Sequence, residues 1–110
     1  MYFKGDGFQC AHAAIKSAPI EDNDIRTLML NHKLTRKNLY IGPLTVTGHI
    51  HLKQPMYFSG EGTDGTVLPY DVECPLPKTG IICIDTCSKE PEALTAMLIR
   101  AKTFSLKSDI

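Results

Sequence analysis

The residues best suited to chemistry in this sequence are two histidines, His49 and His51, with one residue between them. Side chains two positions apart on a β-strand point to the same side, so such a pair can hold a transition metal. Cysteine thiolates are also common zinc ligands, and Cys83 and Cys87 lie close together in the sequence. However, no carboxylate follows His51 at a suitable spacing, and His-x-His pairs are common on solvent-facing strands. We therefore predict no bound metal or other cofactor and keep a zinc site at these four residues as the alternative.

The other nucleophiles and carboxylates form no recognisable catalytic pattern. Reduced thiols are expected for the four cysteines, with disulfides or a metal site as alternatives; these cysteines are Cys10, Cys74, Cys83 and Cys87. Cys83 lies in an apolar run, where burial disfavours the reactive thiolate. Asp71 and Glu73 have the spacing of an acid/base pair on a strand, but the sequence supplies no partner for them. We therefore expect no catalytic residue and no enzyme activity.

The length and charge are those of one small domain. The chain has 110 residues, and its 12 basic side chains balance its 12 acidic ones. A dedicated nucleic-acid binder normally carries a positive excess, so the zero net charge argues against that function. The apolar runs are too short to span a membrane, and the first ten residues do not have the order of a signal peptide. We expect a protein made in the cytoplasm that binds neither nucleic acid nor membrane.

The N-terminal third predicts an arm followed by a helix. Residues 1–18 contain glycines and small side chains without a sustained period, which predicts an irregular arm. Acidic residues followed by apolar residues at helical spacing predict a short helix over residues 21–32. Residues 19–110 are expected to form a single compact domain.

The remaining residues mostly predict short strands. Near-alternating apolar residues predict two or three strands between residues 39 and 52, and further strands at residues 56–58, 67–72 and 81–84. The three glycines within residues 59–65 predict a loop. The fold class is therefore α+β, with mainly short β-strands and one or two short helices.

Residues 88–102 carry conflicting signals. Ser88 could cap a helix, and the alanines and leucines that follow are strong helix formers. The same apolar residues also fit a strand that is buried on both faces. Propensity favours the helix, and periodicity does not decide between the two.

Three short motifs between residues 66 and 110 resemble those of a known family. Tyr70 and Asp71 precede an irregular spacer, Gly80 and Ile81 begin an apolar run, and Thr103 and Phe104 follow a short apolar segment. This order is similar to that of phage capsid decoration proteins of the lambda head protein D type. The resemblance implies that Tyr70 and Asp71 lie at a strand end in the core scaffold and that Gly80 and Ile81 begin a buried strand. It also implies that Thr103 and Phe104 close the domain and that residues 95–101 form a strand.

The resemblance also implies a function. Proteins of this family are not enzymes: they bind the outside of the capsid as trimers at local threefold positions and stabilise the shell. The expected partners are therefore the major capsid protein and two further copies of the chain, and the expected location is the exterior of the virion. Two other functions stay open, namely a small zinc-binding protein or enzyme and a small β-rich protein that binds single-stranded nucleic acid.

The charge distribution and the arm predict how such an assembly would form. Through Pro55 the chain has seven basic and four acidic residues, a net charge of +3, and the remaining five and eight give −3. Opposite charges can join copies head to tail. The expected trimer contacts are Arg26, Arg36 and Lys37 against Glu61, Asp71 and Glu73. The aromatic side chains Tyr2, Phe3 and Phe8 of the arm are expected to bind the capsid, with the arm ordering by strand addition.

Overall fold

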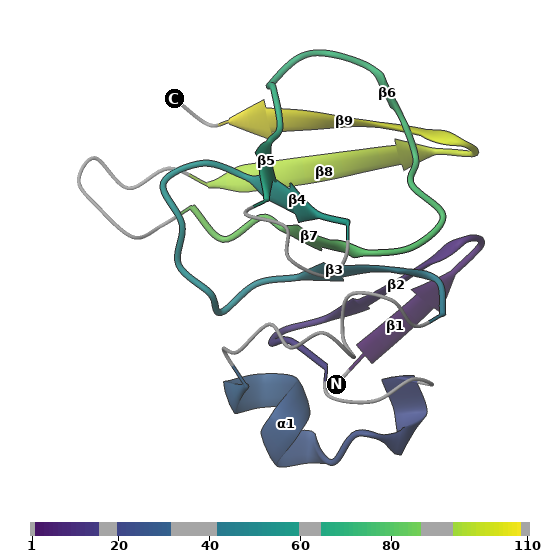
Figure 1. The fold of residues 1–110 in the computed structure, drawn as a ribbon, viewed down its shortest axis with the longest axis vertical. Coiled ribbons are helices and arrows are strands. Elements are labelled where there is room, and N and C mark those ends of the chain that lie inside the picture. Colours follow the sequence, from purple (N-terminus) through teal and green to yellow (C-terminus); the bar gives the residue numbers. More distant parts are fainter. Residues whose placement is uncertain (1, 16–19, 32–41, 60–64, 87–93, 109–110) are drawn as a thin grey trace.

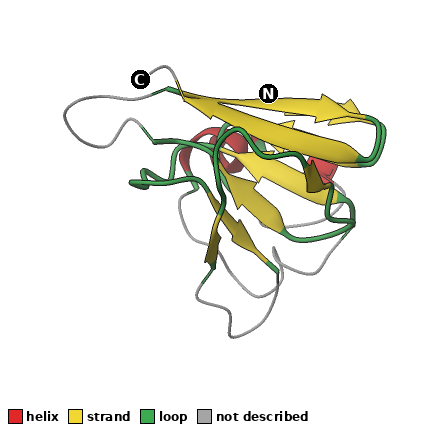
Figure 2. Ribbon diagram, turned by 90° about the horizontal axis from the view of Figure 1, so that it is seen from above, coloured by secondary structure: helices red, strands yellow, loops and turns green. Residues whose placement is uncertain are grey.

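The computed structural model describes residues 2–15, 20–31, 42–59, 65–86 and 94–108. These residues form one domain made mostly of short strands, with one α-helix and one 3-10 turn (Figures 1 and 2). The predicted fold class of mainly short β-strands with one or two short helices is therefore confirmed. No helix among the described residues is long and apolar enough to cross a membrane.

The larger of two sheets has six strands in the order β1-β2-β3-β7-β4-β5. Their bounds are β1 Tyr2–Gly5, β2 Phe8–Ala11, β3 Leu44–Thr47, β4 Met56–Phe58, β5 Thr66–Val67 and β7 Ile81–Cys83. Strands β2, β3 and β7 are parallel neighbours, and the other pairs are antiparallel. The carboxyl ends of three strands therefore meet along one side of this sheet.

The smaller sheet has three antiparallel strands in the order β6-β9-β8. Their bounds are β6 Cys74–Pro75, β8 Thr95–Arg100 and β9 Thr103–Ser108. Phe104 and Leu106 of β9 pack in one buried cluster with Leu44, Val46 and Ile82 of the larger sheet. The core thus lies between the two sheets.

The central strands of the larger sheet are buried on both faces. Since side chains alternate along a strand, Leu44 and Val46 face the smaller sheet while Thr45 and Thr47 face away from it. The buried threonines have hydrogen-bond partners: Gln9 Nε2 donates to Thr45 Oγ1 at 2.9 Å, and Thr47 Oγ1 donates to the carbonyl of His12 at 3.4 Å. These bonds offset the cost of removing polar groups from water.

The end of β2 and the residues after it form a second buried cluster on the far face of the sheet. Ala11 and Ile15 pack there with Ile20 of the 3-10 turn η1 (Ile20–Asp22) and Leu28 of α1 (Ile25–Leu30). The predicted helix over residues 21–32 is therefore shorter, because Asp24 caps it by accepting a hydrogen bond from the Thr27 N–H at 2.7 Å. Of the apolar residues Ile25, Leu28 and Met29 at helical spacing, only Leu28 is buried.

The prediction of an irregular arm over residues 1–18 is wrong for the described part of that segment. Strands β1 and β2 form an antiparallel hairpin, and β2 pairs with β3 in the interior of the sheet. Gln9 is 1% exposed, and Lys4 of β1 forms an ion pair with Glu21 of η1 at 2.8 Å. Glycine content concealed the strand because Gly7 lies in the tight turn, at a φ of 84°. Residues 2–15 therefore belong to the folded domain.

Strand β8 resolves the conflicting signals near the C-terminus. It forms a two-residue hairpin with β9, in which Ala101 has a positive φ of 52°, and the expected strand over residues 95–101 is confirmed over Thr95–Arg100. Pairing with β9 outweighs the helix propensity of its alanine, methionine and leucine residues. Ile81 begins a buried strand, as expected, with Gly80 just before it at a φ of 97°. Thr103 and Phe104 begin the last strand, β9.

Other expected strands are shorter or absent from the described residues. Tyr70 and Asp71 lie in the connection between β5 and β6, so the expectation of a strand end there is wrong. Asp71 has a φ of 60°, which a regular strand does not accommodate, although its N–H donates to the Leu106 carbonyl at 2.9 Å. The predicted strand at 67–72 reduces to β5, and of the strands predicted at 39–52 the described residues contain only β3. Residues 39–41 and 60–64 lie outside the described part of the chain.

Candidate functional site

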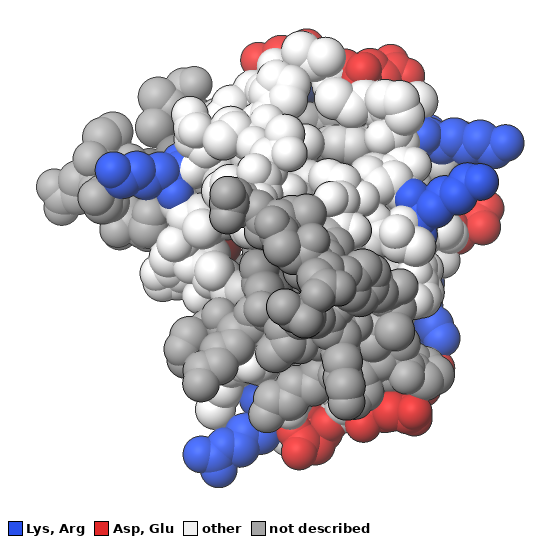
Figure 3. All heavy atoms as spheres, in the orientation of Figure 1, with Lys and Arg blue, Asp and Glu red and all other residues white. Residues whose placement is uncertain are grey.

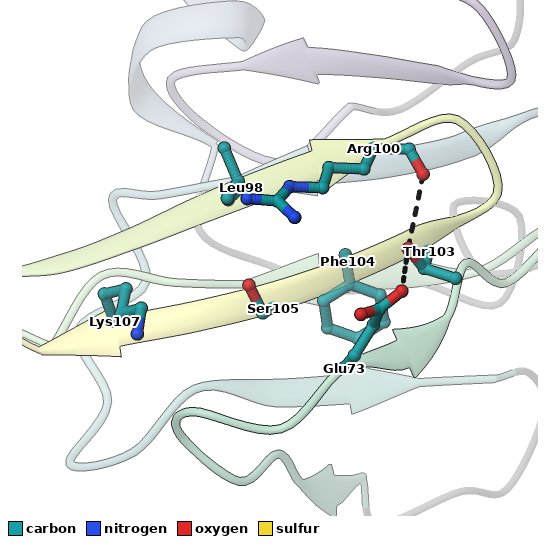
Figure 4. Close-up of a pocket in the computed structure, with 7 residues that line it drawn as sticks. All are labelled: Glu73, Leu98, Arg100, Thr103, Phe104, Ser105 and Lys107. Atoms are coloured by element: carbon teal, nitrogen blue, oxygen red, sulfur yellow. Dashed lines mark hydrogen bonds between the residues drawn. The ribbon is translucent and has the colours of Figure 1, made fainter.

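Two surfaces and one cluster of side chains are candidates for function. The first surface is the outer face of the smaller sheet. Alternation along β8 directs Ala96, Leu98 and Arg100 outward, while Met97 and Ile99 pack on the core. A shallow hollow of about 140 Å³ lies on this face, lined by side chains of β8 and β9 and by Glu73 (Figure 4). Leu98 is 45% exposed beside it, so this sheet presents an apolar side chain to solvent.

The charges on this surface are balanced within the chain. The expected trimer-contact residue Asp71 forms an ion pair with Lys107, with Oδ1 2.8 Å from Nζ. Its companion Glu73 accepts a hydrogen bond from the Thr103 hydroxyl at 2.9 Å (Figure 4). Arg100 also faces the hollow. The two expected acidic contacts therefore have separate partners along β9, Lys107 for Asp71 and Thr103 for Glu73.

The expected basic contact Arg26 lies at the other end of the molecule. It is exposed on α1, which Figure 1 places at the opposite end from the smaller sheet. The acidic residues Glu21, Asp22 and Asp24 are exposed or capping in the same region, so both signs of charge occur at that end (Figure 3). Arg36, Lys37 and Glu61 lie outside the described residues. The described residues therefore do not form one basic end and one acidic end, as head-to-tail attraction between copies would require.

The second surface is the free side of β1, where no strand among the described residues pairs with it, at the edge of the six-stranded sheet. Tyr2 is 46% exposed and Phe3 is 60% exposed. Phe3 also contacts Phe8, with ring centroids 6.0 Å apart. Phe8 itself packs against the core, so only two of the three expected capsid-binding aromatics are available on the surface. An edge strand with exposed aromatic rings is a ready site for pairing with another chain.

A cluster of three histidines and one aspartate lies where three parallel strands end. His12 follows β2, His49 and His51 follow β3, and Asp85 follows β7. All four line a cavity of about 390 Å³. The ring centroids of His12 and His49 are 5.2 Å apart, and those of His49 and His51 are 6.4 Å apart. The structure therefore adds His12 and Asp85 to the pair that the sequence singled out.

Asp85 connects the members of this cluster. Its Oδ2 accepts the backbone N–H of His49 at 3.1 Å and lies 3.5 Å from His51 Nε2. Its carbonyl accepts the N–H of Leu52 at 2.9 Å, which holds the segment after β3 against the end of β7. The expectation that His49 and His51 share a strand is wrong, because His49 has a φ of 63° in a turn. Instead, the backbone N–H of His49 and the imidazole of His51 both contact Asp85.

The alternative zinc site with cysteine ligands finds no support in the described residues. Cys83 is fully buried against Ile50, Leu52 and Phe58, and burial with the nearby Asp85 charge raises its pKa to about 12. Such a thiol stays protonated and is a poor ligand. Cys87 lies outside the described residues. As the side chains lie, no three His, Cys, Asp or Glu groups in the described ranges are close enough to hold a metal ion.

Sequence reasoning missed His12 and Asp85 because they are far from His49 in the sequence. The available signal was that each follows a short apolar strand, but only the parallel pairing of β2, β3 and β7 makes them neighbours. Comparisons of the chain with protein-family models, curated proteins and solved structures found no match. The functional proposal therefore depends on the residues, their geometry and the resemblance of the C-terminal motifs.

Proposed function

We propose that the protein is a structural virion protein, which binds the outside of a phage capsid as a homotrimer at local threefold positions and stabilises the shell. The observation that carries the proposal is the β8–β9 hairpin. The resemblance to capsid decoration proteins required a strand at residues 95–101, where propensity favoured a helix. A strand at Thr95–Arg100 is therefore the outcome that the resemblance, and not local propensity, would produce.

The outer face of the smaller sheet is the proposed contact between the copies. A domain of 110 residues has a thin core, and burial of exposed apolar surface between subunits adds stability. Leu98 supplies the apolar centre of this face. Glu73, Arg100 and Lys107 surround it with charges of both signs, which suits a polar rim. Of the acidic residues expected at the contact, Glu73 lies on this face, and Arg100 and Lys107 are proposed as additional partners.

The free side of β1 is the proposed contact with the major capsid protein. Strand addition at an edge satisfies backbone N–H and C=O groups with those of the partner, and exposed side chains add specificity. Burial of an aromatic side chain is worth about 1.5–3 kcal/mol, and three copies in a trimer repeat the contact. Because β1 is already paired with β2, little ordering entropy is lost on docking. This preformed edge replaces the irregular arm that the sequence predicted.

Sedimentation velocity of the purified chain tests the trimer and its contact surface together. Wild-type protein is expected to sediment as a trimer, and Leu98→Glu is expected to shift it to monomer because three carboxylates would be buried at the contact. Leu30→Glu is the matched control, since Leu30 is a similarly exposed leucine, at 53%, on α1 at the other end of the molecule. A trimer that survives Leu98→Glu, or one that only Leu30→Glu disrupts, would place the contact elsewhere.

Cosedimentation with capsids tests the docking surface. Phe3→Ser is expected to weaken capsid binding by at least tenfold, because each copy loses an aromatic contact. Ile25→Ser is the control, since Ile25 is 65% exposed on α1, away from β1. Wild-type protein that fails to bind capsids from its own virus would contradict the proposed function. Unchanged binding by Phe3→Ser would contradict the role of β1.

A further inference from the structure

The smaller sheet ends at β8, whereas the larger sheet that it covers continues past this point. Met97 and Ile99 of β8 line one cavity together with side chains of β2. One of these side chains belongs to Cys10, which is paired with Phe3 of β1, so Phe3 lies on the same face, where it is 60% exposed. No strand among the described residues covers this part of the larger sheet. The position beside β8 is therefore open to one more strand.

We propose that this position binds an extended segment of another protein, which adds an antiparallel strand to the free side of β8. The segment has apolar side chains at alternate positions and acidic residues at its beginning. This proposal goes beyond the structural role in a capsid and does not depend on it. It concerns the edge of the smaller sheet, whereas the capsid contact proposed above lies at β1 of the larger sheet.

The free side of β8 presents a regular row of backbone groups. A two-residue turn joins β8 to β9, so Arg100 and Thr103 on either side of the turn form a hydrogen-bonded pair. Since hydrogen-bonded pairs alternate along antiparallel strands, the N–H and C=O groups of Thr95, Met97 and Ile99 point away from β9. No backbone group in the described ranges bonds to them on that side. A partner in extended conformation would satisfy these groups.

The cavity beside this row of backbone groups is apolar. It has a volume of about 320 Å³, and its lining consists of Phe8, Cys10, Val46, Ile84, Met97 and Ile99. Burial raises the pKa of the Cys10 thiol, so Cys10 stays protonated and acts as a small apolar group. Directly opposite residues of paired strands share a face, so partner residues opposite Met97 and Ile99 would point into this cavity. Apolar side chains at alternate positions of the partner would therefore be buried, and those between them would face solvent.

Charges at one end of β8 set the direction of the partner. A second cavity, of about 440 Å³, lies there between the β1–β2 turn and the β8–β9 turn, and its charged lining residues are Asp6, Lys78 and Lys102 (Figure 1). Gly7 and Ala101 also line it, next to the ends of β2 and β8, so the two cavities follow one another along β8. Both lysines are exposed, and neither forms an ion pair with a carboxylate of the described residues. This end thus has a net positive charge and favours acidic residues, which come first in an antiparallel partner.

Fluorescence polarisation with a designed peptide tests the proposal on the full-length protein. The probe is a fluorescein-labelled peptide in which two aspartates precede three valine–threonine repeats, and it is expected to bind at one site per chain. In the proposed register the valine N–H groups donate to β8, and the threonine N–H groups point to solvent. N-methylation of the valines should therefore weaken binding at least tenfold, whereas N-methylation of the threonines should not. Equal binding of the two methylated peptides, or no binding of the unmethylated one, would overturn the proposal.

A charge reversal in the protein tests the direction of the bound strand. Lys102→Glu should weaken binding of the unmethylated peptide at least threefold at low ionic strength, and the difference from wild type should shrink as salt is added. Lys53→Glu is the matched control, because Lys53 is also exposed but lines neither cavity beside β8. Both variants should keep the wild-type melting temperature, since both side chains lie on the surface. Equal binding by the two variants, or tighter binding of a peptide with its aspartates last, would contradict the proposal.

Discussion

Replacing Ile15 with alanine tests whether the N-terminal segment is part of the folded core. Ile15 has no exposed surface and packs with Ala11, Ile20 and Leu28 on the far face of the larger sheet. If residues 1–18 formed an independent arm, shortening this side chain would leave the stability of the domain nearly unchanged. Because the segment instead covers the sheet, the substitution should create a cavity inside the domain.

The expected loss follows from burial. Isoleucine-to-alanine substitutions at fully buried sites cost about 2–5 kcal/mol, the sum of lost transfer free energy and the cavity that remains. The cluster around Ile15 is small and includes the short helix α1, which can shift to fill part of the space. We therefore expect a loss near the lower end, about 2–3 kcal/mol. That corresponds to a fall in melting temperature of at least about 8 °C for a domain of this size.

Urea denaturation followed by far-UV circular dichroism measures this loss, since the chain has no tryptophan. The midpoint should fall without a change in the denaturant dependence. Ile25→Ala is the matched control, because Ile25 is 65% exposed, and it should change stability by less than about 0.5 kcal/mol. Equal, negligible losses in the two variants would refute the placement of residues 2–15 in the core.

Three further predictions concern single residues. Gly80→Ala should destabilise by more than about 2 kcal/mol, because its Cβ would lie 2.6 Å from the Phe58 carbonyl oxygen at a positive φ; Gly7→Ala, which meets nothing within 4 Å, should lose only about 1 kcal/mol in the same thermal melts. Ala101→Gly should stabilise by about 0.5–1 kcal/mol, measured by urea denaturation, because glycine relieves the φ of 52° in the β8–β9 turn. The raised pKa of Cys83 means that the unfolded thiol ionises near its usual pKa of 9.0 while the folded thiol stays protonated to about 12. Stability should therefore decline as pH rises from 9 to 12, and Cys83→Ala should reduce that slope in denaturation curves taken at each pH.

The parts of the fold that the sequence predicted correctly depend on local patterns. Met56–Phe58 and Ile81–Cys83 are short apolar runs bounded by glycine or proline, and both are strands. Strand β8 could not be assigned from its own residues, since its helix formers pair with β9 only in the folded chain. The resemblance to a known family supplied that assignment.

The parts that the sequence missed depend on contacts between distant residues. Strand β2 contains glutamine, cysteine and alanine, a weak strand pattern, yet it pairs with β3, more than thirty residues later in the chain. The same pairing brings His12 beside His49 and Asp85, so the histidine cluster has no local sequence pattern. The β1–β2 hairpin does have one, because its two turn residues are Asp6 and Gly7. Asp71 and Glu73 were expected on a strand but lie in the connection between β5 and β6, and their partners Lys107 and Thr103 belong to the last strand.

Electron cryomicroscopy of capsids from the same virus, prepared with and without this protein, tests the proposed function most directly. The capsids with the protein should carry three-lobed protrusions on the outer surface at the local threefold positions, and those without it should lack them. In the protrusions, the smaller sheets should face the threefold axis and β1 should lie against the shell. Capsids that bind no protein, or bind it only as single copies away from the threefold positions, would contradict the proposal.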